Sequence, residues 1–411
     1  STATPQNRLN WIEIWANDTS YNNATSNPGL HFNVSDGLCT TLTVDMNLSA
    51  DLSSQQTCVN VKAHNIKIDC RGNRITYGTA GVEGYGVNVT GYDNVTVKNC
   101  TIVEGNSTGN RKFGVYFSGS LGGSIDNNSI QTNGTNSYAV FINGTNYTNI
   151  VNNTISNGDG STTDSGYGIY LRNSSFNNIT SNNVTTSGDD ANYGIYLFDS
   201  DNNTLVENKI NSTVVGANTY PVFFSSAKFN TLRNSRIWTA GDTNDRNYII
   251  YLLSSDNNTI IDNNLTDIAS NNAGSEFQFD ANSDDNNVSF NTITSNNDGM
   301  ALDGERNFVT YNNISVSETT IAVESSDGEV SYNNLKNTQS NRDTFTINTN
   351  NPPHIYRNNI TKVGSSSDSY VMELISADNN LIEENRIHSN ASASTALWIG
   401  SGSENNMFLN N

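Results

Sequence analysis

Long hydrophobic runs are missing from this 411-residue chain. No stretch approaches the roughly 18 apolar residues of a membrane-spanning helix. Positive charge is also scarce, since 20 Lys and Arg stand against 40 Asp and Glu and the formal net charge is −20 at pH 7. No basic cluster could neutralise phosphates, which excludes nucleic acid as a partner. The acidic balance instead favours solubility and suits divalent cations or a basic partner.

Cysteine is rare, and all four copies lie in the first quarter of the chain. They form no Cys-x-x-Cys pair, so a zinc site is not expected. An even, clustered set in a polar chain is typical of an exported protein with two disulfides. The chain also begins at Ser1 without Met or a signal-like apolar run. We interpret it as a mature extracellular or cell-surface protein whose export signal has been removed.

Hydrophobic residues make up only 34% of the chain, which alone would raise the expectation of disorder. However, only 15% of residues are charged, and the chain has 18 Tyr and 15 Phe, which disordered chains lack. Its polar residues are mainly Asn, Ser and Thr. A chain of 411 residues is longer than an ordinary domain with a single hydrophobic core, so we expect several domains or one array of repeats.

A repeated phrase, Asn-x-Ile or Asn-x-Leu, decides between these two possibilities. It occurs in NNTLVENKI (202–210), NNTIIDNNL (257–265) and NNLIEENRI (379–387). Successive copies begin 21 to 29 residues apart, at Asn73, Cys100, Asn128, Asn153, Asn182, Asn208, Ser235, Asn263, Asn291, Asn312, Asn333, Asn358, Asn385 and Asn411. A period of this length indicates a solenoid, in which stacked units bury a core that one unit could not.

Each repeat also contains a short segment that alternates with a period of two, such as YGVNV (85–89) and YGIYL (193–197), which predicts strands. Two inward columns follow, one from Val87 to Leu397 and one from Val89 to Ile399, and no polar residue interrupts either. Asn tolerates left-handed φ, so we expect the stacked Asn at the sharp turns. Their amides can hydrogen-bond from one rung to the next.

These NNxI rungs resemble the repeats of the pectin-lyase-like superfamily, and in particular NosD-like repeats of microbial surface proteins. The resemblance implies an all-β, single-stranded, right-handed parallel β-helix of about 13–14 rungs over residues 58–411. Residues 1–57 would form an N-terminal extension that caps the first rung. The superfamily includes polysaccharide lyases and hydrolases, adhesins and surface-layer components, so the repeat alone does not indicate which function applies.

The four cysteines fit this stacking. Cys70 and Cys100 follow Asp69 and Asn99 in strands that we take as equivalent, so they should lie on adjacent rungs. A separation near 4.8 Å between rungs lies within the Cα range of a disulfide. We therefore predict the pairs Cys39–Cys58 and Cys70–Cys100.

Catalytic motifs of the related enzymes are not evident. The chain has no Arg-x-Lys phrase, and none of its four His adjoins an Asp-rich strand. One partial match exists, because Asp280, Asp303 and Glu324 occupy the same outward column on three successive rungs. Carboxylates on neighbouring rungs lie close enough to raise one another's pKa or to require a cation. They could form a Ca²⁺ site or a carboxylate pair for glycoside cleavage, or they could simply be solvated acids.

The outward position between the two inward columns is aromatic on six successive rungs. These residues are Tyr116, Phe141, Tyr170, Tyr196, Phe223 and Tyr251. If each ring left about 100 Å² uncovered, the column would form roughly 600 Å² of apolar surface. Such a surface could stabilise the sheet by ring stacking, or it could contact a loop, a sugar or a protein partner. Trp11 and Trp15, in the apolar segment 8–15, are further candidate contacts.

Asn-x-Ser/Thr sequences are frequent, as expected in a chain so rich in these residues. The better candidates for N-glycosylation lie in predicted turns: Asn17, Asn23, Asn106, Asn133, Asn143, Asn173, Asn211 and Asn390.

We draw two kinds of function from this sequence. The first is an extracellular structural glycoprotein that associates with its own copies into a filament, sheath or surface layer. Its support is the missing catalytic set, the aromatic column and a last repeat without a capping helix. The alternative is a polysaccharide lyase or glycoside hydrolase, or a carbohydrate-binding adhesin that holds a surface polysaccharide. Apart from Ca²⁺ at the acidic column, we expect no cofactor.

Overall fold

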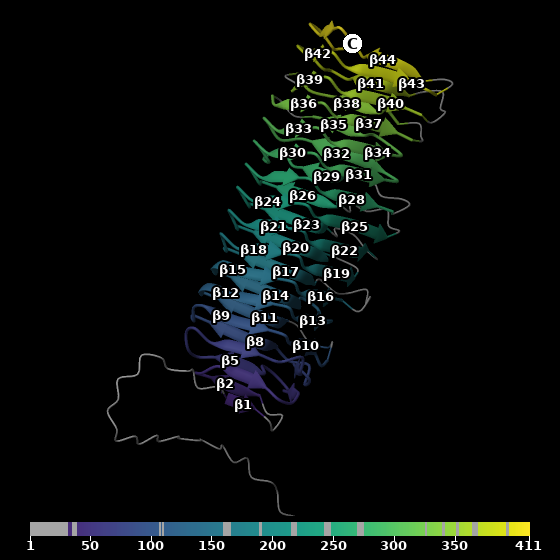
Figure 1. The fold of residues 1–411 in the computed structure, drawn as a ribbon. Coiled ribbons are helices and arrows are strands. Elements are labelled where there is room, and N and C mark those ends of the chain that lie inside the picture. Colours follow the sequence, from purple (N-terminus) through teal and green to yellow (C-terminus); the bar gives the residue numbers. More distant parts are fainter. Residues whose placement is uncertain are drawn as a thin grey trace, which may run out of the picture.

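The structure of the protein is a computed structural model, and Figure 1 shows its fold. It describes residues 32–34, 39–106, 108, 111–158, 166–188, 191–214, 220–241, 248–268, 275–324, 327–338, 342–350, 353–363, 369–391 and 394–411. Within these ranges, the regular secondary structure consists of strands alone. No described helix is long and apolar enough to cross a membrane.

The strands form three parallel sheets that run the length of an elongated stack (Figure 1). Sheet A contains β1 Phe32–Val34, β3 Met46–Leu48, β6 Lys67–Asp69, β9 Val95–Lys98, β12 Leu121–Asp126, β15 Asn146–Val151, β18 Asn178–Thr180, β21 Thr204–Val206, β24 Thr231–Arg233, β27 Thr259–Ile261, β30 Asn287–Ser289, β33 Phe308–Thr310, β36 Glu329–Ser331, β39 His354–Tyr356, β42 Leu381–Glu383 and β45 Met407–Leu409.

Sheet B contains β4 Leu52–Ser53, β7 Arg74–Tyr77, β10 Thr101–Glu104, β13 Ser129–Thr132, β16 Thr154–Asn157, β19 Asn183–Gly188, β22 Lys209–Val214, β25 Arg236–Gly241, β28 Asn264–Asp267, β31 Thr292–Ser295, β34 Asn313–Val316, β37 Asn334–Asn337, β40 Asn359–Lys362 and β43 Arg386–Ser389.

Sheet C contains β2 Thr40–Leu42, β5 Val59–Val61, β8 Gly84–Thr90, β11 Lys112–Ser118, β14 Tyr138–Asn143, β17 Tyr167–Arg172, β20 Tyr193–Phe198, β23 Tyr220–Ser225, β26 Ile250–Leu253, β29 Ser275–Phe279, β32 Asp298–Leu302, β35 Ile321–Val323, β38 Phe345–Ile347, β41 Tyr370–Leu374 and β44 Thr395–Ile399.

Equivalent strands pair in register, so equivalent residues stack. In sheet C, Ile169 pairs with Ile195 and Leu171 pairs with Leu197. The two inward columns predicted from the alternation are confirmed, since their members are buried from Val87 as far as Met372 and Leu374. The last rung differs: Leu397 is half-buried and Ile399 is 47% exposed.

The recurrent Asn form a buried hydrogen-bond ladder at the turn between sheets A and B. The side-chain oxygen of Asn153 accepts the backbone N–H and the side-chain amide of Asn128, at 3.0 Å each. Its own amide donates to the carbonyl of Ile125 at 2.8 Å and to Asn182 Oδ1 at 2.9 Å. Asn411 continues this ladder by accepting the amide of Asn385 at 3.0 Å.

The prediction that the ladder Asn themselves adopt the left-handed backbone is wrong, because the residue one position earlier adopts it. The preceding residue adopts it: Asn127 (φ 54°), Asn152 (φ 56°) and Glu207 (φ 54°) precede buried ladder positions. That residue faces solvent, whereas the ladder Asn turns inward. A second ladder, which includes Asn177 and Asn203, lies at the turn between sheets C and A.

The solenoid begins earlier than the predicted boundary at residue 58. Strand β2 pairs with β5, β3 with β6 and β4 with β7, so residues 40–53 already form a rung. This rung lacks the Asn-x-Ile phrase, so the repeat pattern does not reveal it. Residues 1–31 lie outside the described ranges, so the cap predicted there stays a prediction.

Both predicted disulfides are present. Cys39 bonds to Cys58 with a Cα–Cα distance of 4.6 Å, and Cys70 to Cys100 with 4.7 Å. These distances match the spacing between adjacent rungs. The register of the flanking strands differs from the prediction by one residue. Asp69 was expected to be equivalent to Asn99, but it pairs with Lys98.

A melting series tests this architecture. Ile195→Asp should unfold several rungs, because it places a charge at a fully buried position. Asn208→Ala should cost about 1–3 kcal/mol, because it leaves the carbonyl of Ile179 and the backbone N–H of Asn182 unpaired. Asn264→Ala, at an exposed position, should change stability little. A larger loss for Asn264→Ala than for Asn208→Ala would contradict the ladder.

Candidate functional site

The outer face of sheet C carries the residues that the sequence analysis singled out. Its central outward column is aromatic in the first half of the stack, polar or small over most of the second half, and ends in Trp398. In register, the column reads Tyr116, Phe141, Tyr170, Tyr196, Phe223, Tyr251, Gln278, Ala301, Ala322, Thr346, Glu373 and Trp398.

A second aromatic column packs beside the first. It lies three residues before the central column, outside the position between the two inward columns on which the sequence prediction rests. Its members are Tyr85, Phe113, Tyr138, Tyr167, Tyr193, Tyr220 and Tyr248. Together the columns form a double aromatic ladder. Rings of one column stack face to face, as Phe141 does with Tyr170 at 4.9 Å and 4°. Rings of different columns meet edge to face, as Tyr167 does with Tyr170 at 5.3 Å and 77°.

Stacking changes what this ladder can do. Because the ring faces are occupied by neighbouring rings, they cannot also take a sugar or protein side chain. Phe141 and Phe223 are only 8% and 7% exposed, and the tyrosines of the central column are half-buried. Burial raises the pKa of Tyr170 well above its usual range, so its hydroxyl stays protonated. The broad apolar surface that six exposed rings would have formed is therefore absent, and the ladder mainly stabilises the sheet.

The acidic column follows where the ladder ends. Asp280, Asp303 and Glu324 come directly after β29, β32 and β35, at equivalent positions of successive rungs. Asp280 is held by the N–H of Ser254 at 2.8 Å and by the hydroxyl of Ser283 at 2.6 Å. Glu324, in contrast, is exposed.

Asp303 is the central member of this column and is half-buried. Gln278 donates its side-chain amide to Asp303 Oδ2 at 2.9 Å. Burial and the negative charges of Glu324 and Asp280 together raise the pKa of Asp303 to about 6. Asp303 is therefore about half protonated near pH 6 and about one-tenth protonated at pH 7, which suits a proton donor in mildly acidic solution.

The same column gives no support to the predicted Ca²⁺ site. Across the described residues, no group of three or more His, Cys, Asp and Glu side chains is arranged to hold a metal ion. Arg306, which lies near the column in sequence, is engaged elsewhere. Its guanidinium bonds to Asp285 at 2.8 and 2.9 Å and to Asp284 at 3.3 Å, on the turn towards sheet A.

A second carboxyl pair on sheet C was not anticipated. Glu373, in the central column, shares a hydrogen bond with Asp343 of the preceding rung. Burial, that hydrogen bond and the charge of Asp343 raise the pKa of Glu373 to about 7. Tyr370 and Trp398, whose rings stack at 5.2 Å, flank this pair. The outer face of sheet C thus remains acidic from β29 to β41.

Sheet A carries a hollow that the sequence analysis also missed. It is lined by Asn287, Phe308, Thr310, Tyr311, Glu329, Tyr332 and Tyr356. Phe290 stacks on Tyr311 at 5.0 Å, and Tyr311 on Tyr332 at 4.7 Å. The signal that could have revealed this cluster is an aromatic residue directly before the Asn of the repeat, as in YNNI and YNNL.

The rings at this edge are held in an unfavourable backbone conformation. Phe290, Tyr311 and Tyr332 have φ of 57°, 57° and 54°. Bulky residues with left-handed φ cost about 1–3 kcal/mol each and gather at functional sites. Tyr147 and Phe176 share this backbone and also stack, at 5.2 Å, but they do not line the hollow.

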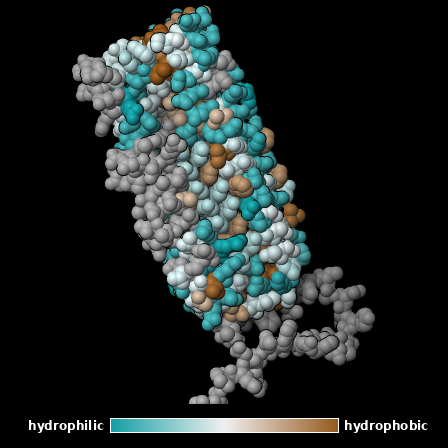
Figure 2. All heavy atoms as spheres, turned by 180° about the vertical axis from the view of Figure 1, so that it is seen from behind, coloured by the Kyte–Doolittle hydropathy of each residue, from teal (hydrophilic) through white to brown (hydrophobic). Residues whose placement is uncertain are grey.

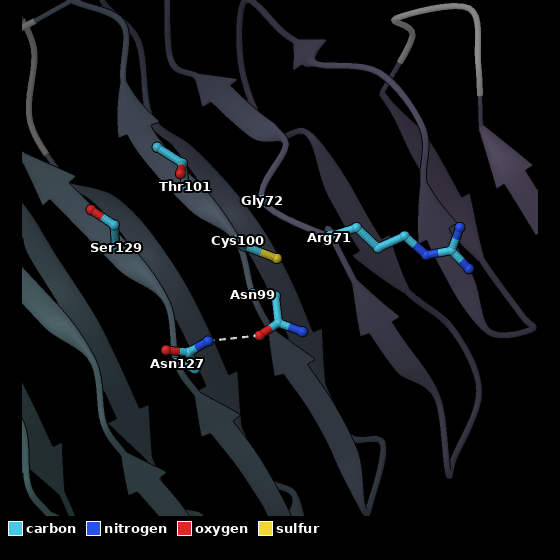
Figure 3. A pocket seen from close by; sticks show the side chains of 7 residues that line it. All are labelled: Arg71, Gly72, Asn99, Cys100, Thr101, Asn127 and Ser129. Atoms are coloured by element: carbon cyan, nitrogen blue, oxygen red, sulfur yellow. Dashed lines mark hydrogen bonds between the residues drawn. The ribbon is translucent and has the colours of Figure 1, made fainter.

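Figure 3 shows another hollow, at the turn beside the disulfide of Cys100. Asn127 donates its amide to Asn99 Oδ1 at 2.8 Å, and the side chain of Arg71 points away from that of Ser129. Its lining contains no carboxylate, histidine or aromatic ring. We interpret it as the space between two turns.

The candidate glycosylation residues differ in exposure. Asn173 and Asn390 are exposed, whereas Asn106, Asn133, Asn143 and Asn211 are half-buried. Asn17 and Asn23 lie outside the described residues, as do Trp11 and Trp15. Glycosylation and contacts of the segment 8–15 remain predictions.

The family described as "Right handed beta helix region" matches residues 57–237 and 189–335. The chain belongs to this family. The match agrees with the three parallel sheets and with the resemblance seen in the repeats. No curated protein sequence matches the chain.

Solved β-helix structures resemble this protein, although their sequence identity to it is low. DFA-IIIase from Arthrobacter chlorophenolicus A6, in complex with DFA-III, is 14% identical with a TM-score of 0.39; the match covers 68% of this chain and 61% of that one. A tailspike protein of E. coli bacteriophage HK620, in complex with a pentasaccharide, is 11% identical with a TM-score of 0.46 and coverages of 91% and 73%. The likeness concerns the fold alone.

The raised pKa of Asp303 gives a test through stability. Its ionised form is disfavoured in the folded protein, so stability is lost as pH rises from 3.8 through about 6. Asp303→Asn should therefore raise the melting temperature at pH 7.5 and change it much less at pH 4. Asp262→Asn, at a partly exposed position outside the column, is the control. An equal effect of Asp303→Asn at both pH values would show that the carboxyl is not perturbed.

Proposed function

We propose that this β-helix protein is a glycoside hydrolase that acts on an extended neutral glycan lying across the outer face of sheet C. Asp303 is the proton donor and Glu324 the nucleophile. The observation that carries the proposal is the position of Asp303, half-buried between two carboxylates with its pKa raised to about 6. Glycoside cleavage needs such a pair, one carboxyl protonated and one ionised.

The neighbouring side chains suit these roles. Gln278 fixes one oxygen of Asp303. Asp280 is held by Ser254 and Ser283, so Glu324 is the member of the column best able to approach a substrate. Adjacent rungs lie about 4.8 Å apart, close to the roughly 5 Å between the two carboxyls of retaining enzymes.

The reaction would then proceed in two steps. Asp303 gives its proton to the glycosidic oxygen as the bond from that oxygen to the anomeric carbon breaks. Glu324 attacks the anomeric carbon and forms a glycosyl ester. Water then attacks the same carbon, Asp303 takes a proton from that water, and Glu324 leaves as a carboxylate. The product keeps the anomeric configuration of the substrate.

The geometry supports hydrolysis better than the other functions considered. A calcium-dependent lyase needs a metal and a basic residue, but Arg306 is bound to Asp284 and Asp285. Lateral self-association and sugar binding through the aromatic column both need open ring faces, which the stacked ladder lacks. On the face in Figure 2, hydrophobic residues form small separate groups within a mostly hydrophilic surface.

Cleavage of neutral polysaccharides tests the proposal. Glucans, mannans, galactans and fructans are incubated with the protein, and new reducing ends are measured. Asp303→Asn and Glu324→Gln should each lower the rate by about 10²–10⁴-fold, whereas Asp262→Asn should leave it unchanged. In the parent protein, kcat/KM should fall as pH rises above about 6, because Asp303 loses its proton.

Two results would contradict the proposal. One is cleavage that survives both Asp303→Asn and Glu324→Gln. The other is an absence of cleavage together with filaments in electron micrographs, which would favour the self-associating structural protein. Inverted products in an NMR assay would leave hydrolysis standing but remove Glu324 as nucleophile.

A further inference from the structure

We infer that the hollow on the outer face of sheet A is a second carbohydrate site, which binds one neutral sugar unit of a glycan without cleaving it. The site lies between Phe308 on one side and the Phe290–Tyr311–Tyr332 stack on the other. It is formed by β30, β33, β36 and β39 and is separate from the acidic column, which follows strands of sheet C.

The walls of this hollow are aromatic and accessible. Phe308 is 45% exposed and Tyr311 is 48% exposed, in contrast with Phe141 and Phe223 of the double aromatic ladder. The small side chain of Thr310, at the end of β33, lies in the lining together with these walls. A hollow of about 460 Å³ results, within the usual range of small-molecule sites.

The polar groups of the hollow are the amide of Asn287, the hydroxyls of Thr310 and the tyrosines, and the carboxylate of Glu329. The Tyr356 hydroxyl donates to Glu329 Oε1 at 2.8 Å, and the Ser331 hydroxyl donates to the same oxygen. No Lys, Arg or His forms an ion pair with Glu329 among the described residues. Its second oxygen has capacity for a further donor.

This lining selects the class of ligand. Aromatic walls pack against C–H groups, and Glu329, Thr310 and the Tyr hydroxyls can bond to sugar hydroxyls. A uronate or sulfated sugar would meet the negative charge of Glu329, which lines the hollow, so the sugar is neutral. A protein partner would need about 800 Å² of contact, whereas the exposed rings gather around one hollow.

The residue before each ladder position has a left-handed backbone throughout the stack, and three successive rungs of this cluster place aromatic rings there. Phe290, Tyr311 and Tyr332 keep left-handed φ values, which Asn would adopt at less cost. The Arg357 guanidinium lies 5.6 Å from the centre of the Tyr332 ring and bonds to its hydroxyl. The ring stack is thereby held in place at its C-terminal end.

Calorimetric titration of the full chain carrying Asp303→Asn tests the inference, because this background prevents cleavage by the proposed mechanism. The probes are neutral hexasaccharides from glucan, mannan, galactan and fructan, with hexagalacturonate as the charged counterpart. At least one neutral hexasaccharide should bind, and hexagalacturonate should bind at least about tenfold more weakly.

Variants then assign the binding to the hollow. Tyr311→Ala should weaken binding by about tenfold or more, because it removes an aromatic wall. Glu329→Gln, which conserves size, should weaken it severalfold. Phe176→Ala is the matched control, since Phe176 is also exposed, stacked and left-handed but does not line the hollow.

Melting temperatures separate lost binding from lost folding, because Tyr311→Ala and Phe176→Ala should lower stability similarly. The inference is overturned if no neutral hexasaccharide binds, or if Tyr311→Ala and Glu329→Gln bind as tightly as Phe176→Ala. Failure of the proposed hydrolysis looks different: Asp303→Asn would then cleave as the parent does, and binding at the hollow would still depend on Tyr311.

Discussion

The hydrogen bonds by which the buried ladder Asn join one rung to the next are the interactions on which this structure depends. A parallel solenoid turns sharply at every corner, and a buried corner leaves backbone N–H and C=O groups without strand partners. At the turn between sheets A and B, Asn153 accepts from Asn128 and donates to both Ile125 and Asn182. One side chain therefore satisfies groups on both neighbouring rungs, and the low hydrophobic content of the chain is compatible with a stable core.

Because these ladders and the inward columns fix the register, outward positions are free to vary from rung to rung. Sheet C uses this freedom twice, first for rings that stack on one another and then for carboxyls on neighbouring rungs. The stacked rings stabilise the sheet, whereas burial and the neighbouring carboxyls raise the pKa of Asp303, so that its ionised form destabilises the sheet. Unfavourable groups that persist in an ordered array are where function is expected.

The sequence predicted the fold well because alternation and repeat length report directly on strands and stacking. It located the columns from Val87 and Val89, the two disulfides and the acidic column. It misplaced the left-handed residue because Asn-Asn does not reveal which Asn is buried. It missed the pair Asp343–Glu373 and the hollow around Tyr311, because these depend on how side chains from several rungs lean together, which a repeat pattern does not encode.

The central claim is that a glycan lies across the acidic face of sheet C. A crystal structure of the Asp303→Asn protein with an uncleaved neutral oligosaccharide tests it most directly. We predict a glycosidic oxygen within hydrogen-bond reach of the side chain at position 303 and the anomeric carbon facing Glu324. An oligosaccharide bound only elsewhere, with ordered water alone over Asp280, position 303 and Glu324, would contradict the account.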